Sequence, residues 1–198
     1  MARLRIIGGA LSGRRFDVPV RPGTRPTSDR VREALSSALQ ARAAFEGARV
    51  LDLFAGTGAL AFEALSRGAA EATLVDRDRH VARTLGRSAE TLGLADRVTI
   101  LARDAFKPKD LSEVCVQGPF DLVLLDPPYA YASRLDSLLG ELRPSLAPNA
   151  WVVIEHGGDS PLLPSSSTGL SPHASYRYGA TAIELLTVQP MSPESTPA

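Results

Sequence analysis

The 198-residue sequence has one cysteine, no hydrophobic run of membrane-spanning length and no formal net charge. A single cysteine, Cys115, excludes an intramolecular disulfide framework and a cysteine zinc cluster. No apolar run approaches the roughly eighteen residues that a membrane helix needs. Arg3 and Arg5 are followed by no long apolar stretch, so we identify no secretory signal and expect a cytoplasmic protein without a membrane partner. The length suits one domain with its own core.

Histidine and lysine are also scarce. The three histidines, His80, His156 and His173, lie in unrelated contexts without ligand spacing, so we expect no metal site. Only two of the 22 basic residues are lysine, and the other twenty are arginine. Arginine presents a planar fork that suits bidentate contacts with phosphate or guanine.

The zero net charge conceals an uneven distribution along the chain. Residues 1–32 contain eight Arg and two Asp, whereas the other 166 residues contain 14 basic and 20 acidic side chains. The two parts therefore carry formal charges of +6 and −6. Zero net charge alone argues against a strong nucleic-acid binder, but a local surplus is typical of a surface that binds a polyanion. A solvated arginine-rich face is the alternative.

Residues 1–27 are expected to form a basic hairpin followed by an extended segment. The apolar run 4–7, turn glycines and an alternating run 14–18 predict the hairpin. Three prolines between residues 19 and 26 exclude regular structure there. A helix then follows, because a cap at 27–29 precedes apolar residues with helical spacing: Val31, Leu35 and Leu39.

From residue 49 onward, short apolar runs alternate with helical patterns, which predicts βαβ units and a parallel sheet buried on both faces. The expected strands are 49–54, 72–75, 97–101, 120–125 and 150–154, and the helices end near 67 or cover 78–92, 107–115 and 131–146. A last strand pair, 176–179 and 182–188, is expected to be antiparallel. We expect a mobile loop over the Gly-, Ser- and Pro-rich region 157–172, and a disordered tail at 189–198.

Four polar signatures follow four of the predicted strands. They are the glycine turn 52–58 (Asp-Leu-Phe-Ala-Gly-Thr-Gly), Asp76, Asp104 with Ala105, and the turn 126–129 (Asp-Pro-Pro-Tyr). Open parallel sheets bind ligands at the carboxyl ends of their strands, so these signatures predict one ligand site. The glycines let the backbone approach a ligand, and Asp76 can accept both hydroxyls of a ribose.

The glycine turn alone leaves the ligand open. Gly56 to Ala61 also fits the G-x-G-x-x-G/A dinucleotide fingerprint, with Asp76 at about the expected distance. An NAD-dependent oxidoreductase therefore remains an alternative.

The Asp-Pro-Pro-Tyr turn favours methyl transfer to a planar exocyclic amine, whose lone pair is delocalised and weakly nucleophilic. The Asp126 carboxylate and the Pro127 carbonyl can each accept one N–H and turn the lone pair toward an electrophile. Two prolines stiffen the turn, and Tyr129 offers a ring on which a base can stack. The electrophile would be the methyl group of S-adenosylmethionine. Adenine N6 and protein amides share this chemistry with guanine N2, and a non-catalytic RNA-binding factor is a further alternative.

The chain resembles the RsmD-type family of class I S-adenosylmethionine-dependent methyltransferases, which methylate N2 of a guanine in bacterial 16S ribosomal RNA. The similarity covers most of residues 3–188. It includes the segments 5–9, 13–16, 23–35, 51–58 and 63–68, then Asp104-Ala105, the Asp-Pro-Pro-Tyr turn and 178–181. Ser88, where the family usually has Asn, is one departure, and Ser36 and Ala61 are others.

The resemblance implies an α/β, Rossmann-like fold: a mostly parallel seven-stranded sheet with helices on both faces and a small N-terminal β-hairpin extension. It divides the chain into an RNA-contacting segment 1–27, a methyltransferase domain 28–188 and the tail 189–198. It also implies a monomer that acts on 16S ribosomal RNA in assembling 30S particles.

The same resemblance assigns roles to individual residues. S-adenosylmethionine would be held by Asp52, Phe54, Gly56, Thr57, Gly58, Asp76 (ribose), Asp104 and Ala105 (adenine). The guanine would be held by Asp126, Pro127 and Tyr129, and the RNA backbone by Arg5, Arg14, Arg15, Arg25, Arg30 and Arg32.

Overall fold

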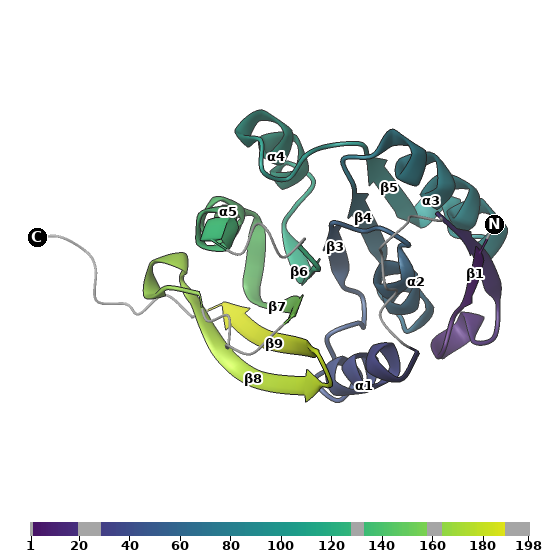
Figure 1. Ribbon diagram of the computed structural model, residues 1–198, viewed down its shortest axis with the longest axis horizontal. Helices are drawn as coiled ribbons and strands as arrows, with labels where there is room; N and C mark the ends of the chain where they lie inside the picture. The colour runs from purple at the N-terminus through teal and green to yellow at the C-terminus, as the bar shows by residue number, and fades with distance from the viewer. Residues whose placement is uncertain (1, 20–28, 128–132, 158–163, 189–198) are drawn as a thin grey trace, which may run out of the picture.

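A computed structural model describes residues 2–19, 29–127, 133–157 and 164–188 (Figure 1). Its main sheet has seven strands in the order β5-β4-β3-β6-β7-β9-β8. In chain order these strands are β3 (Arg49–Leu53), β4 (Glu71–Val75), β5 (Val98–Leu101), β6 (Phe120–Leu125), β7 (Leu146–Gly157), β8 (Leu170–Tyr178) and β9 (Thr181–Val188). The first five pair in parallel, and β9 is antiparallel to both β7 and β8. The mostly parallel seven-stranded sheet is thus confirmed.

The strand order reverses between β3 and β6. From β3 the chain proceeds outward to β4 and β5, and it then returns to β6 on the other side of β3. Such a reversal opens a crevice at the carboxyl ends of the two central strands, because their following connections diverge to opposite sides. The fold therefore directs a ligand to the ends of β3 and β6.

Helices cover both faces of the sheet. One face packs against α1 (Asp29–Gln40), α2 (Ala59–Ser66) and α3 (Arg79–Leu92), and the other packs against α4 (Pro108–Cys115) and α5 (Leu135–Leu142). Successive residues of a strand point to opposite faces, so Val50 of β3 joins the first apolar cluster whereas Leu51 and Leu53 join the second. The strands are apolar on both faces for this reason.

A separate two-stranded sheet is formed by β1 (Ala2–Arg5) and β2 (Arg15–Val18), which pair antiparallel as predicted. A short 3-10 helix, η1 (Gly9–Leu11), lies between them. The hairpin packs on the same side as α2 and α3 (Figure 1), and the Phe16 and Phe62 rings meet edge to face with centroids 5.2 Å apart. The hairpin therefore shares the core of the main domain.

Two sequence-based boundaries are wrong. The helix expected at 131–146 is shorter, because α5 ends at Leu142, Pro144 lies in a 3-10 turn, and β7 already begins at Leu146. The expected loop 157–172 also ends early, since η5 covers Ser166–Thr168 and β8 starts at Leu170. The register of β8 shifts after Pro172, and an edge strand tolerates proline at such an irregularity. Residues 158–163 of that loop and the tail 189–198 lie outside the described residues.

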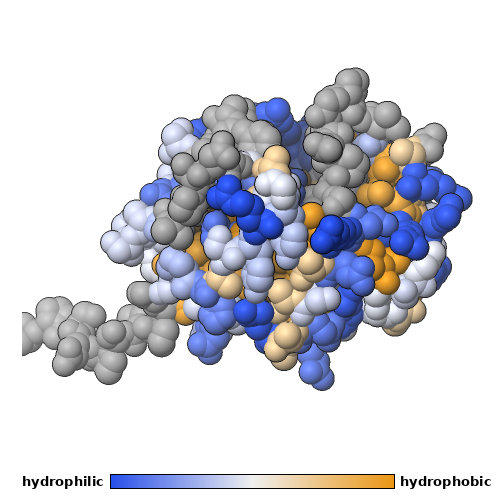
Figure 2. Space-filling model, turned by 60° about the horizontal axis from the view of Figure 1, so that its bottom comes forward, coloured by the Kyte–Doolittle hydropathy of each residue, from blue (hydrophilic) through white to orange (hydrophobic). Residues whose placement is uncertain are grey.

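The face that carries α1 and β8 mixes hydrophilic and hydrophobic residues (Figure 2). In the described part of the chain, Val116 is the one large hydrophobic residue that is mostly exposed. None of the described helices has the length and apolar character needed to cross a membrane.

Candidate active site

The four polar signatures meet at one edge of the sheet. In the ladders Leu53 pairs with both Val75 and Leu125, and Val75 pairs with Leu101, so β3, β4, β5 and β6 end level with one another. Each signature begins inside or just beyond one of these strand ends. The expectation that the signatures share one crevice agrees with this arrangement.

The glycine turn combines one crowded glycine with one open glycine. Gly58 precedes α2 with a φ of 72°, and a Cβ there would lie 2.6 Å from Leu85 Cδ2 and 2.8 Å from a Phe62 ring carbon. Gly58 is therefore required for the packing of α2. A Cβ at Gly56 would meet only the Phe54 carbonyl oxygen, at 3.7 Å. The backbone at Gly56 is open, so a ligand can approach it closely.

Asp76 joins its own strand end to the glycine turn. Its Oδ2 accepts a hydrogen bond from the Gly56 N–H at 3.1 Å, and its Oδ1 accepts one from the Asp78 N–H at 2.9 Å. Only 6% of Asp76 is exposed. These bonds fix the carboxylate, as recognition of a ribose requires.

Asp52 is buried beneath the glycine turn. Burial raises the pKa of this carboxyl to about 8; the Ala61 N–H at the start of α2 opposes the shift, and the negative charges of Asp126 and Asp76 add to it. Three acidic side chains therefore act on one another in this crevice. A cationic ligand would relieve their repulsion, whereas an anionic ligand would increase it.

A stack of side chains joins the glycine turn to the segment that follows Asp104 and Ala105. The Phe54 ring, at a residue with a φ of 65°, lies 5.3 Å from the Phe106 ring, which follows Asp104 and Ala105. The Arg134 guanidinium lies 4.6 Å from the centre of the Phe106 ring, and its Nη2 donates to the Phe106 carbonyl at 2.8 Å. A non-glycine residue at positive φ is strained and often marks a functional site. Phe106 and Arg134 were missed from the sequence, although Phe106 directly follows Asp104-Ala105.

Asp126 begins the turn after β6. The residue is exposed to solvent, yet the desolvation caused by the protein around its carboxyl group raises the pKa of that group to about 6. Among the described residues, none forms a hydrogen bond with the Asp126 carboxylate. Pro127 is buried next to it. Tyr129, the third residue expected to hold the base, lies outside the described residues.

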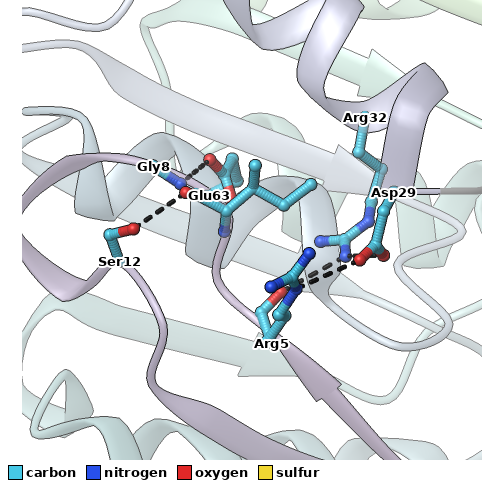
Figure 3. A network of polar contacts seen from close by, with 7 residues as sticks. Arg5, Gly8, Ser12, Asp29, Arg32 and Glu63 are labelled. Atoms are coloured by element: carbon cyan, nitrogen blue, oxygen red, sulfur yellow. Dashed lines mark hydrogen bonds and ion pairs between the residues drawn. The ribbon is translucent and has the colours of Figure 1, made fainter.

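The arginines expected to contact RNA differ in their surroundings (Figure 3). Arg32 is only 1% exposed, and its Nη2 donates to the Arg5 carbonyl at 3.2 Å and to Asp29 Oδ1 at 2.8 Å. Its side chain is thus part of the interior, and a surface contact with RNA does not fit this position. Arg5 pairs with Asp29 at 3.3 Å.

The remaining expected RNA contacts also differ. Arg14 donates to the Leu92 carbonyl at 2.9 Å and to the Thr91 carbonyl at 3.0 Å, and so caps the end of α3. Arg15 and Arg30 are exposed. Arg25 lies outside the described residues.

Glu63 of α2 fastens the hairpin to the main domain, a role that sequence reasoning missed. Its carboxylate accepts hydrogen bonds from the Ile7 and Gly8 N–H groups, both at 2.8 Å, and Figure 3 shows Glu63 beside Gly8. The same carboxylate pairs with Arg67 at 2.8 Å. Ser66 accepts from the Leu11 N–H at 2.9 Å. Because α2 also begins at the glycine turn, one helix connects the hairpin to the crevice.

No group of three or more His, Cys, Asp or Glu side chains suited to a metal ion occurs among the residues that the structure describes. The buried pair His156 and Glu184, with nitrogen and oxygen 3.4 Å apart, is a two-residue contact between β7 and β9. We therefore assign no metal to the site.

The sheet order, the glycine turn and the acidic strand ends together define a class I methyltransferase. Residues 4–187 match the family described as Conserved hypothetical protein 95, and the chain belongs to that family. It is 40% identical to Ribosomal RNA small subunit methyltransferase D of Escherichia coli strain K12 over 154 residues, which are 77% of this chain and 71% of that protein.

Solved structures agree with this membership. The Escherichia coli protein yhhF superimposes with a TM-score of 0.79 at 34% identity, covering 95% of this chain and 99% of that one. An RNA methyltransferase from Salinibacter ruber, in complex with S-adenosyl-L-homocysteine, matches with a TM-score of 0.62 at 21% identity, covering 86% and 98%. The second similarity concerns the fold alone.

Proposed function

We propose that this protein transfers a methyl group from S-adenosylmethionine to the exocyclic N2 amine of a guanine in 16S ribosomal RNA, in the assembling 30S particle. The observation that carries the proposal is the position of Asp126, a carboxylate at the end of β6 and beside the glycine turn of β3 that has no hydrogen-bond partner among the described residues. Membership in a family with a ribosomal RNA methyltransferase among its relatives supports the RNA substrate.

The charge of the crevice favours S-adenosylmethionine over NAD. A diphosphate of NAD would have to bind at the start of α2. The Ala61 N–H there already donates a hydrogen bond to Asp52, and the Gly56 N–H already donates one to Asp76. Both carboxyl groups would also repel the diphosphate once ionised. The methionine ammonium and the sulfonium of S-adenosylmethionine are positive and therefore fit this environment. We accordingly abandon the oxidoreductase alternative.

The residues of the crevice divide the binding task. Asp76, held by two backbone N–H groups, would take the ribose, and the loop of Asp104 and Ala105 would take the adenine edge. The open backbone at Gly56 and the buried Asp52 would hold the methionine part, with Phe54, Thr57 and Gly58 in the same turn. When bound, S-adenosylmethionine supplies an electrophilic methyl group.

Asp126 and Pro127 would prepare the nucleophile. One carboxylate oxygen of Asp126 and the Pro127 carbonyl would each accept a guanine N2–H, which directs the nitrogen lone pair toward the cofactor. As the new N–C bond forms and the methyl–sulfur bond breaks, the amine nitrogen becomes positive. The Asp126 carboxylate stabilises that charge and can accept the proton that leaves. Tyr129 would stack on the base.

The test is the substitution of Asp126 by alanine. Asp126→Ala should reduce methyl transfer to 16S ribosomal RNA by about 100-fold or more, because one acceptor and one charge are lost. Binding of S-adenosylmethionine, measured by calorimetry, should stay within about twofold, since Asp126 faces the base. Equal loss of cofactor binding and transfer would contradict the role assigned to Asp126. Tight binding of NAD without binding of S-adenosylmethionine would contradict the function itself.

A further inference from the structure

Three arginines form a stripe along the exposed side of α3, and we call it the α3 stripe: Arg79, Arg83 and Arg87. All three side chains are exposed, whereas Val81, Leu85 and Leu92 of the same helix are buried. Residues four apart lie on one side of a helix, so the stripe extends for about 12 Å. The stripe belongs to the 166 residues that together carry a formal charge of −6, and a charge count by segment therefore conceals it.

The positive charges of the stripe have no acidic partner among the described residues. The arginines that form ion pairs with acidic side chains in the described part of the chain are other ones, and the Arg87 side chain donates to the Thr84 hydroxyl at 3.3 Å. Asp78 caps the first turn by accepting the His80 N–H at 2.7 Å. Like charges four residues apart on a helix repel one another and destabilise the helix. The isolated protein thus gains nothing from this arrangement, whereas a polyanion would be attracted by it.

The position of the stripe connects the hairpin to the crevice. Arg79 lies three residues after Asp76, at the edge where the cofactor would bind. At the other end, Arg14 of the hairpin caps α3, and Ser88 donates to the Asp17 carbonyl of β2 at 2.6 Å. The hairpin lies beside α3 (Figure 1). A chain of phosphates could therefore pass from the hairpin along α3 toward Asp126.

The hairpin itself offers less free charge than its sequence suggests. Arg3 pairs with Asp17 at 3.1 Å, Arg5 pairs with Asp29, and Arg14 is occupied as a helix cap. The α3 stripe supplies three further positive charges on the adjoining surface. Together with the exposed Arg15 it forms a larger basic surface than the hairpin alone.

We propose that the α3 stripe binds the sugar-phosphate backbone of the RNA substrate and extends the contact surface of the hairpin toward the active site. The inference rests on the proposed function, which supplies the RNA. Phosphate contacts of this kind fix the position of RNA on the protein and add salt-dependent affinity without reading sequence.

The experiment compares the full chain with two triple variants at Arg79, Arg83 and Arg87, all changed to Gln or all to Lys. Binding to an unmodified 16S ribosomal RNA transcript is measured from low to moderate salt. Each lost contact with single-stranded RNA reduces the slope of log K against log salt by about 0.7, so the Gln variant should lose about 2. Its affinity should fall at least about tenfold at physiological salt. The Lys variant should keep most of the slope, because Lys still provides the charge.

Two controls separate the possible outcomes. Arg177→Gln, at an exposed arginine on β8, should leave the slope nearly unchanged, whereas Arg83→Gln should lower it. Cofactor affinity and thermal stability of the Gln triple variant should not decrease. If the wild type binds RNA and the Gln triple variant shows the same salt slope, the proposed role of the α3 stripe is refuted, and the proposed function is not. A loss seen only with protein-containing particles would mean that the partner is a protein and would also refute it. If the wild type binds no RNA, the proposed substrate fails as well.

Discussion

Two aspartates in the crevice have raised pKa values, and each makes a different property of the protein depend on pH. Asp126 is an exposed residue at the position where substrate would bind, whereas Asp52, in β3 before the glycine turn, is only 4% exposed. Titration of Asp126 should therefore affect catalysis, and titration of Asp52 should affect stability.

Catalysis should require the ionised form of Asp126. The pKa of this carboxyl is raised to about 6, so below that value it becomes protonated and loses the charge that stabilises the developing cation. We expect kcat/KM for RNA to fall as the pH is lowered through about 6. Asp126→Asn keeps an oxygen acceptor but does not titrate, so its lower activity should not show this fall. An identical pH profile in the variant would assign the titration to another group.

Stability should decrease as the pH rises because of Asp52. The pKa of this carboxyl is about 8 in the folded protein, above the value of about 4 in an unfolded chain. Between these values the folded state holds a proton that the unfolded state releases, so the free energy of unfolding declines across this window. Asp52→Asn should therefore raise the unfolding free energy at pH 8 by about 1–3 kcal/mol, measured by denaturant titration. Asp96→Asn, at an exposed residue, is the control. An unchanged pH dependence in Asp52→Asn would contradict this account.

Single residues also show where sequence reasoning succeeds and where it stops. The position of the aspartates at the edge of the sheet could be predicted, because each apolar run marks a buried strand and the residues that follow the run lie at the end of that strand. Arg32 was misjudged, since charge alone suggested a surface position. A positional signal was present: Arg32 is three, four and seven residues before the buried Leu35, Ser36 and Leu39, so it belongs to the buried side of α1.

Helix α2 links two functional parts of the protein. It begins at Gly58 in the crevice, and Glu63 and Ser66 near its end bind the backbone of the hairpin. The approach is very close, because a Cβ on Gly9 would lie 2.0 Å from the Ser66 carbonyl oxygen. The hairpin is thereby held at a fixed position relative to the glycine turn. RNA bound by the hairpin would therefore have a fixed position relative to Asp126.

Weakening this attachment should loosen the hairpin. In Glu63→Gln one backbone N–H would face an NH2 group, and leaving a buried N–H unpaired costs about 1–3 kcal/mol. We expect faster hydrogen exchange at Ile7 and Gly8 and a higher KM for RNA, with affinity for S-adenosylmethionine changed little. Glu90→Gln, at an exposed residue of α3, should change none of these. Unaltered exchange in Glu63→Gln would show that Glu63 does not hold the hairpin.

At the scale of elements, the sequence predicted the order of helices and strands better than their ends. Apolar periodicity identified β3 to β6 closely, because buried strands require continuous apolar runs. It failed at β8, since an exposed edge strand needs no such run and Pro172 suggested a loop. The docking of the hairpin by Glu63 is a contact between residues more than fifty positions apart, and periodicity within one element contains no information on it.

At the scale of the whole molecule, the distribution of charge matters more than its sum. Counted along the sequence, residues 1–32 carry a formal charge of +6 and the other 166 residues carry −6. In the folded chain the exposed positive charge does not follow this division. Arg32 is buried and Arg14 caps a helix, while the α3 stripe adds exposed positive charge beside the hairpin. The acidic crevice of Asp52, Asp76 and Asp126 opens at the edge where the stripe begins. The proposed path for RNA, which is basic, and the proposed site for a cationic cofactor, which is acidic, thus lie next to each other.

The most direct test of the central claim is to locate the transferred methyl group. Small-subunit particles without the modification would be incubated with the protein and methyl-labelled S-adenosylmethionine, and the 16S ribosomal RNA would be analysed by mass spectrometry. The account predicts one labelled N2-methylguanine with the wild type and essentially none with Asp126→Ala. Label on an adenine, on a ribosomal protein, or at the same level with Asp126→Ala would contradict it.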